Sequence, residues 1–279
     1  MKKLLLLPVL LLVFKLHAQQ GTVFKITYLP NKEYSAAVTI NLNGHFNLSG
    51  DEQSMQKLKR QGVSNPVAVI YNIKMIGDDR TGTPDANAVF PLVMKWQTSD
   101  VTENINGNEV PLPQLKKTFI IYNHIMPDGK VVADSVVEEK KEETSKTVLS
   151  KIDNAFQNQV KFPNKPLKVG DTFTRDLYIK IPLGATNIPA IAKTTYTLTS
   201  IADGYVYFDM AQNIDVTTPV KQGEPKITGT GSGKVVYSIG DSFIKDFDDN
   251  VNLIFGGYLT NVKIDGTGAM EIKYSYSVK

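Results

Sequence analysis

The chain of 279 residues carries 31 basic and 28 acidic side chains and contains no cysteine. Without cysteine it can form neither disulfide bonds nor the lipid anchor of a bacterial lipoprotein, so a buried apolar core must stabilise the fold. The first eighteen residues hold three lysines and no acidic residue, which leaves the remaining 261 residues formally neutral. We therefore expect no nucleic-acid partner.

Residues 1–18 have the pattern of a secretory signal peptide. Two lysines precede an apolar run at residues 4–14, and Ala18 places a small residue before Gln19. The run is about half as long as a helix that crosses a bilayer. We therefore expect cleavage between Ala18 and Gln19, export to the periplasm or the medium, and no transmembrane segment in the processed chain.

Alternating apolar and polar residues predict β-strands over nearly all of the processed chain. In the C-terminal segment, Met270, Ile272 and Tyr274 share one face of an extended chain, and their neighbours Glu271 and Lys273 share the other. Similar runs predict strands at residues 34–42, 67–76, 89–96, 117–124, 172–181, 193–201, 204–214 and 235–239. Five dipeptides that are typical of turns separate these runs: Asn43-Gly44, Asn106-Gly107, Asp128-Gly129, Asp203-Gly204 and Gly256-Gly257.

Two segments depart from the β pattern. Residues 51–61 predict one short helix that Ser49 or Asp51 caps and Gly62 ends. Residues 138–159 open with the charged run EEKKEE and continue with apolar residues at near-helical spacing. We expect this second helix to pack on its own domain, with a helix that binds a partner as the alternative.

The order of these elements predicts a mainly β protein with two related halves. Residues 19–137 form the N-terminal β unit, residues 138–159 the linking helix, and residues 160–279 the C-terminal β unit. Three short patterns built on tyrosine, methionine and aspartate recur in the same order in both halves. We expect two tandem antiparallel curved sheets, shaped as half-barrels or sandwiches, that arose by internal duplication.

The run Gly229–Lys234 (GTGSGK) resembles a phosphate-binding loop but lacks its spacing. Thr228 stands where the first glycine is required, and Val235 follows the lysine in place of serine or threonine. A predicted strand follows, whereas a phosphate-binding loop opens a helix. We expect a flexible start of a strand or a bulged strand.

Asp246, Asp248 and Asn250 are weak candidates for a calcium site. Their spacing matches the first three ligands of a calcium loop, but Val251 and Gly257 occupy the positions of its glycine and its bidentate glutamate. We expect instead an acidic hairpin turn between two strands, and neither a metal nor a cofactor.

The processed chain keeps two histidines, His45 after a predicted turn and His124 at a predicted strand end. No serine stands in a nucleophile motif, and no HExxH pattern is present. We therefore assign no catalytic residue and expect a protein that is not an enzyme. A hydrolase that uses carboxylates from distant strands stays open, because such pairs leave no local signature.

The segment Phe162–Phe173 (FPNKPLKVGDTF) is the sharpest motif of the chain. Pro163 and Pro166 favour an extended approach, and Gly170-Asp171 turns the chain into the next strand. Together with the Ala-Gln-Gln end of the signal, this motif resembles a family of uncharacterised exported β-rich proteins of Bacteroidota, a domain of unknown function. The resemblance implies an exported protein and no particular activity.

Three functions fit these patterns. The first is a non-catalytic binding protein of the cell envelope, in which curved sheets hold a lipid or another hydrophobic ligand in an apolar groove. The second is a structural or interaction module that meets another envelope protein through a sheet edge or an apolar patch. The third is the hydrolase with dispersed carboxylates. We expect the first, because the predicted strands are rich in aromatic residues and no catalytic motif is present.

Overall fold

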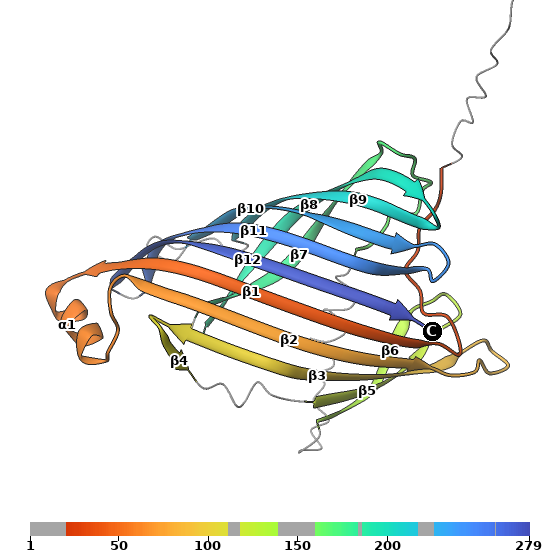
Figure 1. Cartoon of the computed structure of the whole chain (residues 1–279), viewed down its shortest axis with the longest axis horizontal. Helices are drawn as coiled ribbons and strands as arrows, with labels where there is room; N and C mark the ends of the chain where they lie inside the picture. Colours follow the sequence, from red (N-terminus) through yellow and green to blue (C-terminus); the bar gives the residue numbers. More distant parts are fainter. Residues whose placement is uncertain (1–20, 111–117, 139–159, 184–185, 217–225, 260) are drawn as a thin grey trace, which may run out of the picture.

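The computed structural model describes residues 21–110, 118–138, 160–183, 186–216, 226–259 and 261–279 (Figure 1). The expected cleavage site between Ala18 and Gln19 lies outside these residues, and so do residues 139–159 of the expected linking helix. Within the described residues the chain forms twelve strands and one short helix, which confirms the mainly β class.

All twelve strands belong to one antiparallel sheet. They are β1 (Glu33–Gly50), β2 (Val67–Thr81), β3 (Phe90–Ile105), β4 (Asn108–Val110), β5 (Thr118–Ile125), β6 (Val131–Glu138), β7 (Thr172–Leu183), β8 (Thr186–Ala202), β9 (Tyr205–Val216), β10 (Lys226–Ser238), β11 (Phe243–Leu259) and β12 (Val262–Val278). Their order is β6-β5-β3-β2-β1-β12-β11-β10-β9-β8-β7, and β4 pairs with β3 alone. The sheet thus consists of two meanders that meet through the first and the last strand.

The expectation of two tandem sheets is wrong. β1 pairs with the whole of β12, from Tyr34 opposite Val278 to Gly50 opposite Val262. This pairing joins the N-terminal and C-terminal strands into one sheet. Alternation along a sequence predicts a strand and its two faces, but it does not identify the strand that will pair with it. The sequence therefore predicts the strands better than their grouping.

The predicted short helix is confirmed as α1 (Glu52–Arg60). Asp51 is its N-cap, and the Asp51 carboxylate accepts hydrogen bonds from the Ser54 backbone N–H at 2.7 Å and the Ser54 hydroxyl at 2.9 Å. Gly62 has a φ of 79°, in the left-handed region that ends helices. Since α1 contains no buried residue, it serves mainly to connect β1 with β2 at one end of the sheet (Figure 1).

Three of the five expected turns are confirmed. Asn106-Gly107 and Asp203-Gly204 have positive φ at both residues, and Gly129 of the third turn has a φ of 84°. These turns join consecutive strands of the meanders, where the sequence signal is local and sufficient.

The other two glycine dipeptides lie inside strands. Asn43-Gly44 is part of β1, where a Cβ on Gly44 would lie 2.7 Å from the ring of Phe46. The glycine therefore makes room for an aromatic ring on the face of the sheet. Gly256-Gly257 lies inside β11. A dipeptide alone does not distinguish a turn glycine from one that makes space within a strand.

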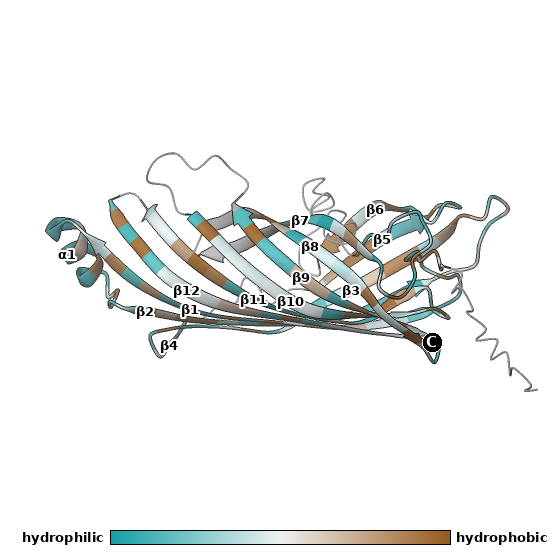
Figure 2. Cartoon of the chain, turned by 90° about the horizontal axis from the view of Figure 1, so that it is seen from above, coloured by the Kyte–Doolittle hydropathy of each residue, from teal (hydrophilic) through white to brown (hydrophobic). Residues whose placement is uncertain are grey.

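The sheet is bent into an open trough. Figure 2 shows the long central strands at the bottom of the trough and the edge strands β6 and β7 rising on the same side. Two segments without strand structure, residues 21–32 and 160–171, lie on the concave side at one end. They pair with each other at Thr22 and Leu167, whose N–H and C=O groups form two hydrogen bonds of 2.9 Å. We call these residues the covering segments, and their end of the trough the packed end.

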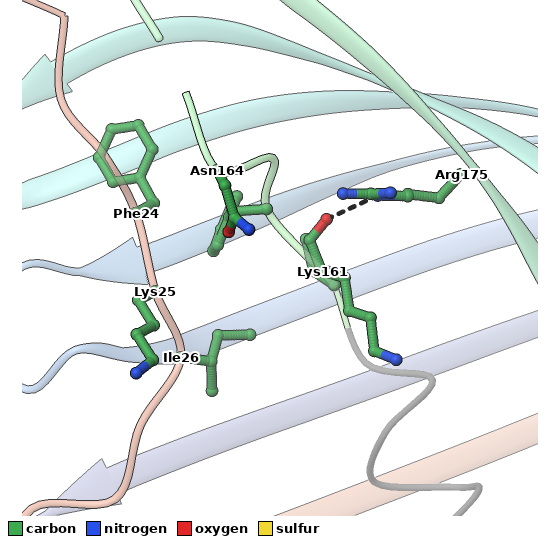
Figure 3. Close-up of a pocket in the computed structure, with 8 residues that line it drawn as sticks. Phe24, Lys25, Ile26, Lys161, Asn164 and Arg175 are labelled. Carbon is green, nitrogen blue, oxygen red and sulfur yellow. Dashed lines mark hydrogen bonds between the residues drawn. The ribbon is translucent and has the colours of Figure 1, made fainter. Parts of the chain in front are cut away.

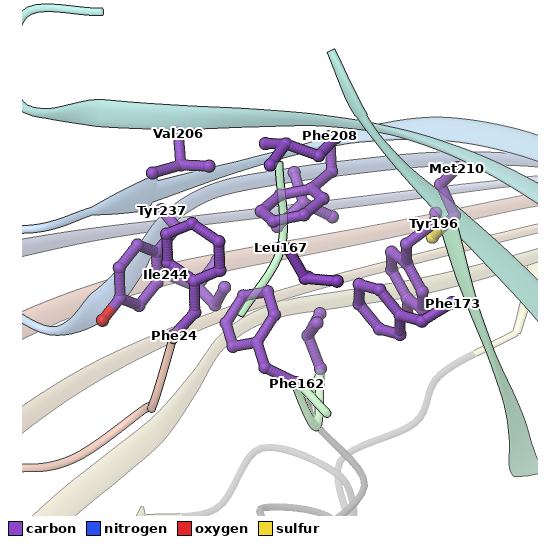
Figure 4. Close-up of a cluster of buried hydrophobic side chains, with 13 residues drawn as sticks. Phe24, Phe162, Leu167, Phe173, Tyr196, Val206, Phe208, Met210, Tyr237 and Ile244 are labelled. Carbon is purple, nitrogen blue, oxygen red and sulfur yellow. The ribbon is translucent and has the colours of Figure 1, made fainter. Parts of the chain in front are cut away.

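Aromatic rings from the covering segments fill the packed end. Phe24 and Phe162 lie 5.5 Å apart between ring centroids, and Phe162 lies 5.3 Å from both Phe208 and Tyr237 (Figure 4). A second buried cluster gathers around Tyr34 at the same end. The third cluster occupies the opposite half of the concave face, where it includes Leu42, Phe46, Ile214, Ile227, Val251, Leu253 and Phe255.

The recurring sequence patterns fall on strands in corresponding places of the two meanders. Tyr71 on β2 and Tyr196 on β8 both face the concave side. Tyr122 on β5, however, is 42% exposed, whereas its expected counterpart Tyr237 on β10 is buried. The internal duplication therefore stays a prediction.

Candidate functional site

One row of residues crosses the concave face midway between the two ends of the sheet. Ile73 on β2 lies opposite Ile40 on β1, Ile40 lies opposite Ile272 on β12, and Ile272 lies opposite Asp249 on β11. The row continues across β10, β9 and β8 through Gly233, Met210 and Tyr196. Residues in register point to the same face, so the row is apolar over three central strands and becomes polar at β11.

The three isoleucines of this row are only half-buried, and none of them is part of the three buried clusters. Five half-buried residues on the same face flank them and pack against the buried clusters: Val38, Tyr71, Met75, Met270 and Tyr274. We call these eight residues the apolar strip. The strip runs along β2, β1 and β12, so it forms a continuous apolar surface on the concave face of the trough.

A pocket of about 360 Å³ lies at the packed end, between the covering segments (Figure 3). Phe24, Ile26 and Phe162 give it apolar walls, and Arg175 of the edge strand β7 lines another side. The Arg175 Nε–H donates a hydrogen bond of 2.8 Å to the Lys161 carbonyl. This bond ties the second covering segment to the edge of the sheet.

Asp249 is a buried carboxyl at the point where the row becomes polar, and it is only 4% exposed. Burial raises the pKa of Asp249 to about 6, and hydrogen bonding with Gln212 opposes that rise. Asp249 Oδ1, Gln212 Oε1 and the Tyr196 hydroxyl are buried and have no hydrogen-bond partner in the part of the chain that the structure describes. Buried polar atoms are nearly always hydrogen-bonded, so each of these three atoms has hydrogen-bonding capacity that the described residues do not use.

The glycines of GTGSGK make room for the side chains of β9 and for close approach of the β11 backbone. The motif lies inside β10, and its register with β11 is unbroken from residue 226 to residue 236. A Cβ on Gly231 would lie 2.5 Å from Gln212 Oε1, and a Cβ on Gly233 would lie 2.7 Å from Met210 Cε. The glycines thus let the side chains of β9 lie across β10 toward β11. The motif is part of a strand, as expected, but it lies in the regular interior of β10, so the expected strand start or bulge is wrong. Packing explains its glycines.

A second buried carboxyl, Asp79 on β2, is hydrogen-bonded to side chains. The hydroxyls of Tyr28 and Tyr276 donate to Asp79 Oδ2 at 3.1 and 3.0 Å. Burial raises the pKa of Asp79 to about 7, while hydrogen bonds from Tyr276, Tyr28 and Trp96 oppose the rise. Because Tyr28 belongs to residues 21–32, Asp79 connects the first covering segment with the sheet.

Asp79 and Asp249 do not form a pair of catalytic carboxylates. Asp79 lies opposite Tyr34, whereas Asp249 is in the row of Ile40, so about 20 Å separates them along the strand direction alone. Pairs of carboxylates in glycosidases lie within about 10 Å of each other. These two buried carboxyls therefore do not provide the geometry that a hydrolase with dispersed carboxylates requires.

The calcium candidates lie on β11, and the expected acidic hairpin turn is wrong. Asp246, Asp248 and Asn250 follow one another on the convex face at intervals of about 7 Å, and the Asn250 amide donates to Asp248 at 2.9 Å. Asp248 lies opposite Lys234 and Lys273 on the neighbouring strands, so the acidic run is accommodated on a polar face. Nowhere in the described chain do three or more His, Cys, Asp or Glu side chains gather as metal ligands would.

Neither histidine takes part in the concave site. His45 lies on the exposed convex face of β1, so the expected turn before it is wrong. His124 lies next to the end of β5, as expected, and its Nδ1 is 2.8 Å from Asp134 Oδ1. The sequence missed Asp249, Gln212 and Tyr196, because they come from three different strands. The one usable signal was the spacing of the glycines on β10.

No protein-family model and no curated protein matches the chain. Among the residues that the structure describes, no helix is long and apolar enough to cross a membrane.

Proposed function

We propose that this is an exported, non-catalytic binding protein that holds a lipid or another hydrophobic ligand on the apolar strip. The observation that carries the proposal is the row of Ile40, Ile73 and Ile272, which are directly paired and half-buried outside the buried clusters. Concave surfaces lined by apolar side chains are the usual place for small ligands. Each methylene that a ligand buries there contributes about 0.8 kcal/mol to binding.

The two faces of the sheet support this proposal by their contrast. The convex face opposite the strip carries Asn41, Asn72 and Glu271, and the Asn41 amide donates to Glu271 at 2.9 Å. The concave face of the same strands carries aliphatic side chains, methionines and two tyrosines along the strip, and no charged side chain. A hydrophobic ligand would therefore gain from contact with one face alone.

Strand β2 offers a matched pair of substitutions that tests the proposal. Ile73 lies on the concave strip, and Ile76 lies on the convex face, where it is 46% exposed. We expect Ile73→Gln to weaken the binding of decanol by about five- to tenfold, because the ligand loses apolar contact. Ile76→Gln should leave the affinity unchanged. Isothermal titration calorimetry below the micelle-forming concentration measures both.

Native mass spectrometry of the protein purified from its own envelope identifies the natural ligand class. A stoichiometric lipid or other hydrophobic molecule that is released by organic extraction supports the proposal. If decanol does not bind and the purified protein carries no ligand, the proposal is wrong, and the envelope-protein interaction module takes its place.

A further inference from the structure

Asp249 stands at the end of the apolar strip, directly opposite Ile272. A ligand that lies on the three isoleucines therefore has one end beside this carboxyl. Gln212 on β9 extends over β10, where its Oε1 lies above Gly231, and Tyr196 on β8 lies in the same row as Asp249 but three strands away. The apolar strip therefore ends at a buried polar group on the concave face of the sheet.

The polar group has unused hydrogen-bonding capacity. Asp249, Gln212 and Tyr196 are 4%, 6% and 0% exposed, and each has one oxygen that makes no hydrogen bond with the described residues. A buried polar atom without a partner costs about 1–3 kcal/mol. Asp79 also has one oxygen without a partner among the described residues, Oδ1, but two tyrosine hydroxyls donate to its other oxygen, Oδ2.

The free oxygens define the chemistry of their partner. An ionised carboxylate and an amide oxygen accept hydrogen bonds and cannot donate them, and a tyrosine hydroxyl can accept as well. No ion pair with Asp249 occurs within the described ranges, and the Nε–H of Arg175, the cation that influences Tyr196, is used by the Lys161 carbonyl. A fitting partner therefore brings several donors and one positive charge.

We propose that the ligand of the apolar strip is an amphiphile with a primary amine head, which Asp249 and Gln212 bind. This inference rests on the proposed function. A primary ammonium group has N–H donors for the free oxygens of Asp249 and Gln212, and its charge balances the buried carboxylate. Gly231 and Gly233 have no side chains, so the side chains of Gln212 and Met210 can lie close over β10.

The test compares probes that share one alkyl chain and differ in the head: decylamine, decyltrimethylammonium, decanol and decanoate. Near pH 7.5 Asp249 is ionised, because its pKa is about 6, and decylamine is protonated. We expect decylamine to bind about tenfold more tightly than decanol, because its head forms charged hydrogen bonds. Decyltrimethylammonium should not share this gain, because it has the charge without the donors. Decanoate should bind most weakly.

Substitutions test whether the polar group causes the preference for decylamine over decanol. Asp249→Asn should abolish the advantage of decylamine over decanol while decanol affinity stays the same, and Gln212→Met should reduce the advantage. Asp79→Asn is the matched control, since Asp79 is a buried carboxyl on the same face with tyrosine partners, and it should keep the full advantage. Thermal unfolding shows that each variant is folded. The Gln212 variant keeps the test decisive if Asp249→Asn does not fold.

Three results would overturn the inference. Equal binding of all four probes would leave the proposed function standing and remove the amine preference. An undiminished preference in Asp249→Asn would place the amine elsewhere. A crystal structure soaked with decylamine that shows only ordered water on Asp249, Gln212 and Tyr196 would do the same. If none of the probes binds, the proposed function itself fails.

Discussion

The packed end and the middle of the trough share one sheet and one concave face, but they differ in what lies on them. At the packed end, the covering segments bring Phe24, Phe162 and Leu167 into a buried cluster with the strands. In the middle, Ile40 and Ile272 remain half-buried outside every buried cluster. The same alternating strands therefore build a core in one region and an apolar surface in the other.

The two buried carboxyls follow the same division. Asp79 receives a hydrogen bond from Tyr28, which belongs to a covering segment. Asp249 lies beside the apolar strip and receives no tyrosine hydroxyl, although one oxygen of each carboxyl, Oδ1, has no partner among the described residues. The first covering segment thus supplies Asp79 with a donor that Asp249 lacks. Beyond the covering segments, the three isoleucines of the strip stay half-buried.

The largest expected effect belongs to the packed end. Phe162→Ala removes ring contacts with Phe24, Phe173, Phe208 and Tyr237. We expect the free energy of unfolding to fall by about 3–5 kcal/mol, as for other buried phenylalanines. Urea denaturation followed by circular dichroism measures the change.

Tyr178→Ala on β7 is the control for this substitution, because Tyr178 is 68% exposed. Its cost should stay within about 0.5 kcal/mol. If Phe162→Ala costs no more than Tyr178→Ala, the second covering segment does not stabilise the sheet, and the contrast between the two regions fails.

Asp79 predicts a pH dependence of stability. Its pKa is raised from 3.8 to about 7 in the folded protein, so between these values the folded state binds more protons than the unfolded state. The free energy of unfolding should therefore decrease as pH rises from about 4 to 7, by at most about 4 kcal/mol from this group. Asp79→Asn should remove that decrease.

Denaturation at several pH values tests this prediction, and Asp249→Asn sharpens it. The Asp249 contribution has the same sign and is complete at about pH 6. The two variants should therefore flatten the profile over different ranges. If the free energy of unfolding of the wild-type protein does not decrease between pH 4 and 7, burial does not destabilise the ionised forms of these carboxyls.

Local sequence signals predicted the elements of the fold but not their assembly. Strict alternation identified the C-terminal strand, and Asp51 with Gly62 identified α1, because these signals act between near neighbours in the chain. The β1–β12 pairing joins residues more than two hundred positions apart. Alternation does not identify such a pairing. The strands were therefore predicted correctly, but their grouping into two sheets was wrong.

The candidate site was harder to predict for the same reason. Asp249 belongs to a run of acidic residues that resembles a turn, and only its place in β11 shows that it alternates to the buried face. The glycines at 229, 231 and 233 carried a usable signal, since alternate glycines in a strand indicate that side chains cross above them. Gln212 on β9 comes near Asp249 on β11 only through the pairing of both strands with β10.

The smallest expected effect concerns the bond between Tyr28 and Asp79. Tyr28→Phe removes one hydroxyl donor at 3.1 Å and keeps the ring that packs 4.9 Å from Tyr34. The loss should be about 1 kcal/mol near pH 8, where Asp79 is ionised, and smaller near pH 5, where it is protonated. The loss is larger near pH 8 because an ionised carboxylate is stabilised more by a hydrogen-bond donor than a neutral carboxyl is. Urea denaturation at the two pH values measures the difference, and an equal cost at both would show that Tyr28 contributes through its ring alone. In that case the first covering segment would be held by packing, and Asp79 would no longer distinguish the packed end from the apolar strip.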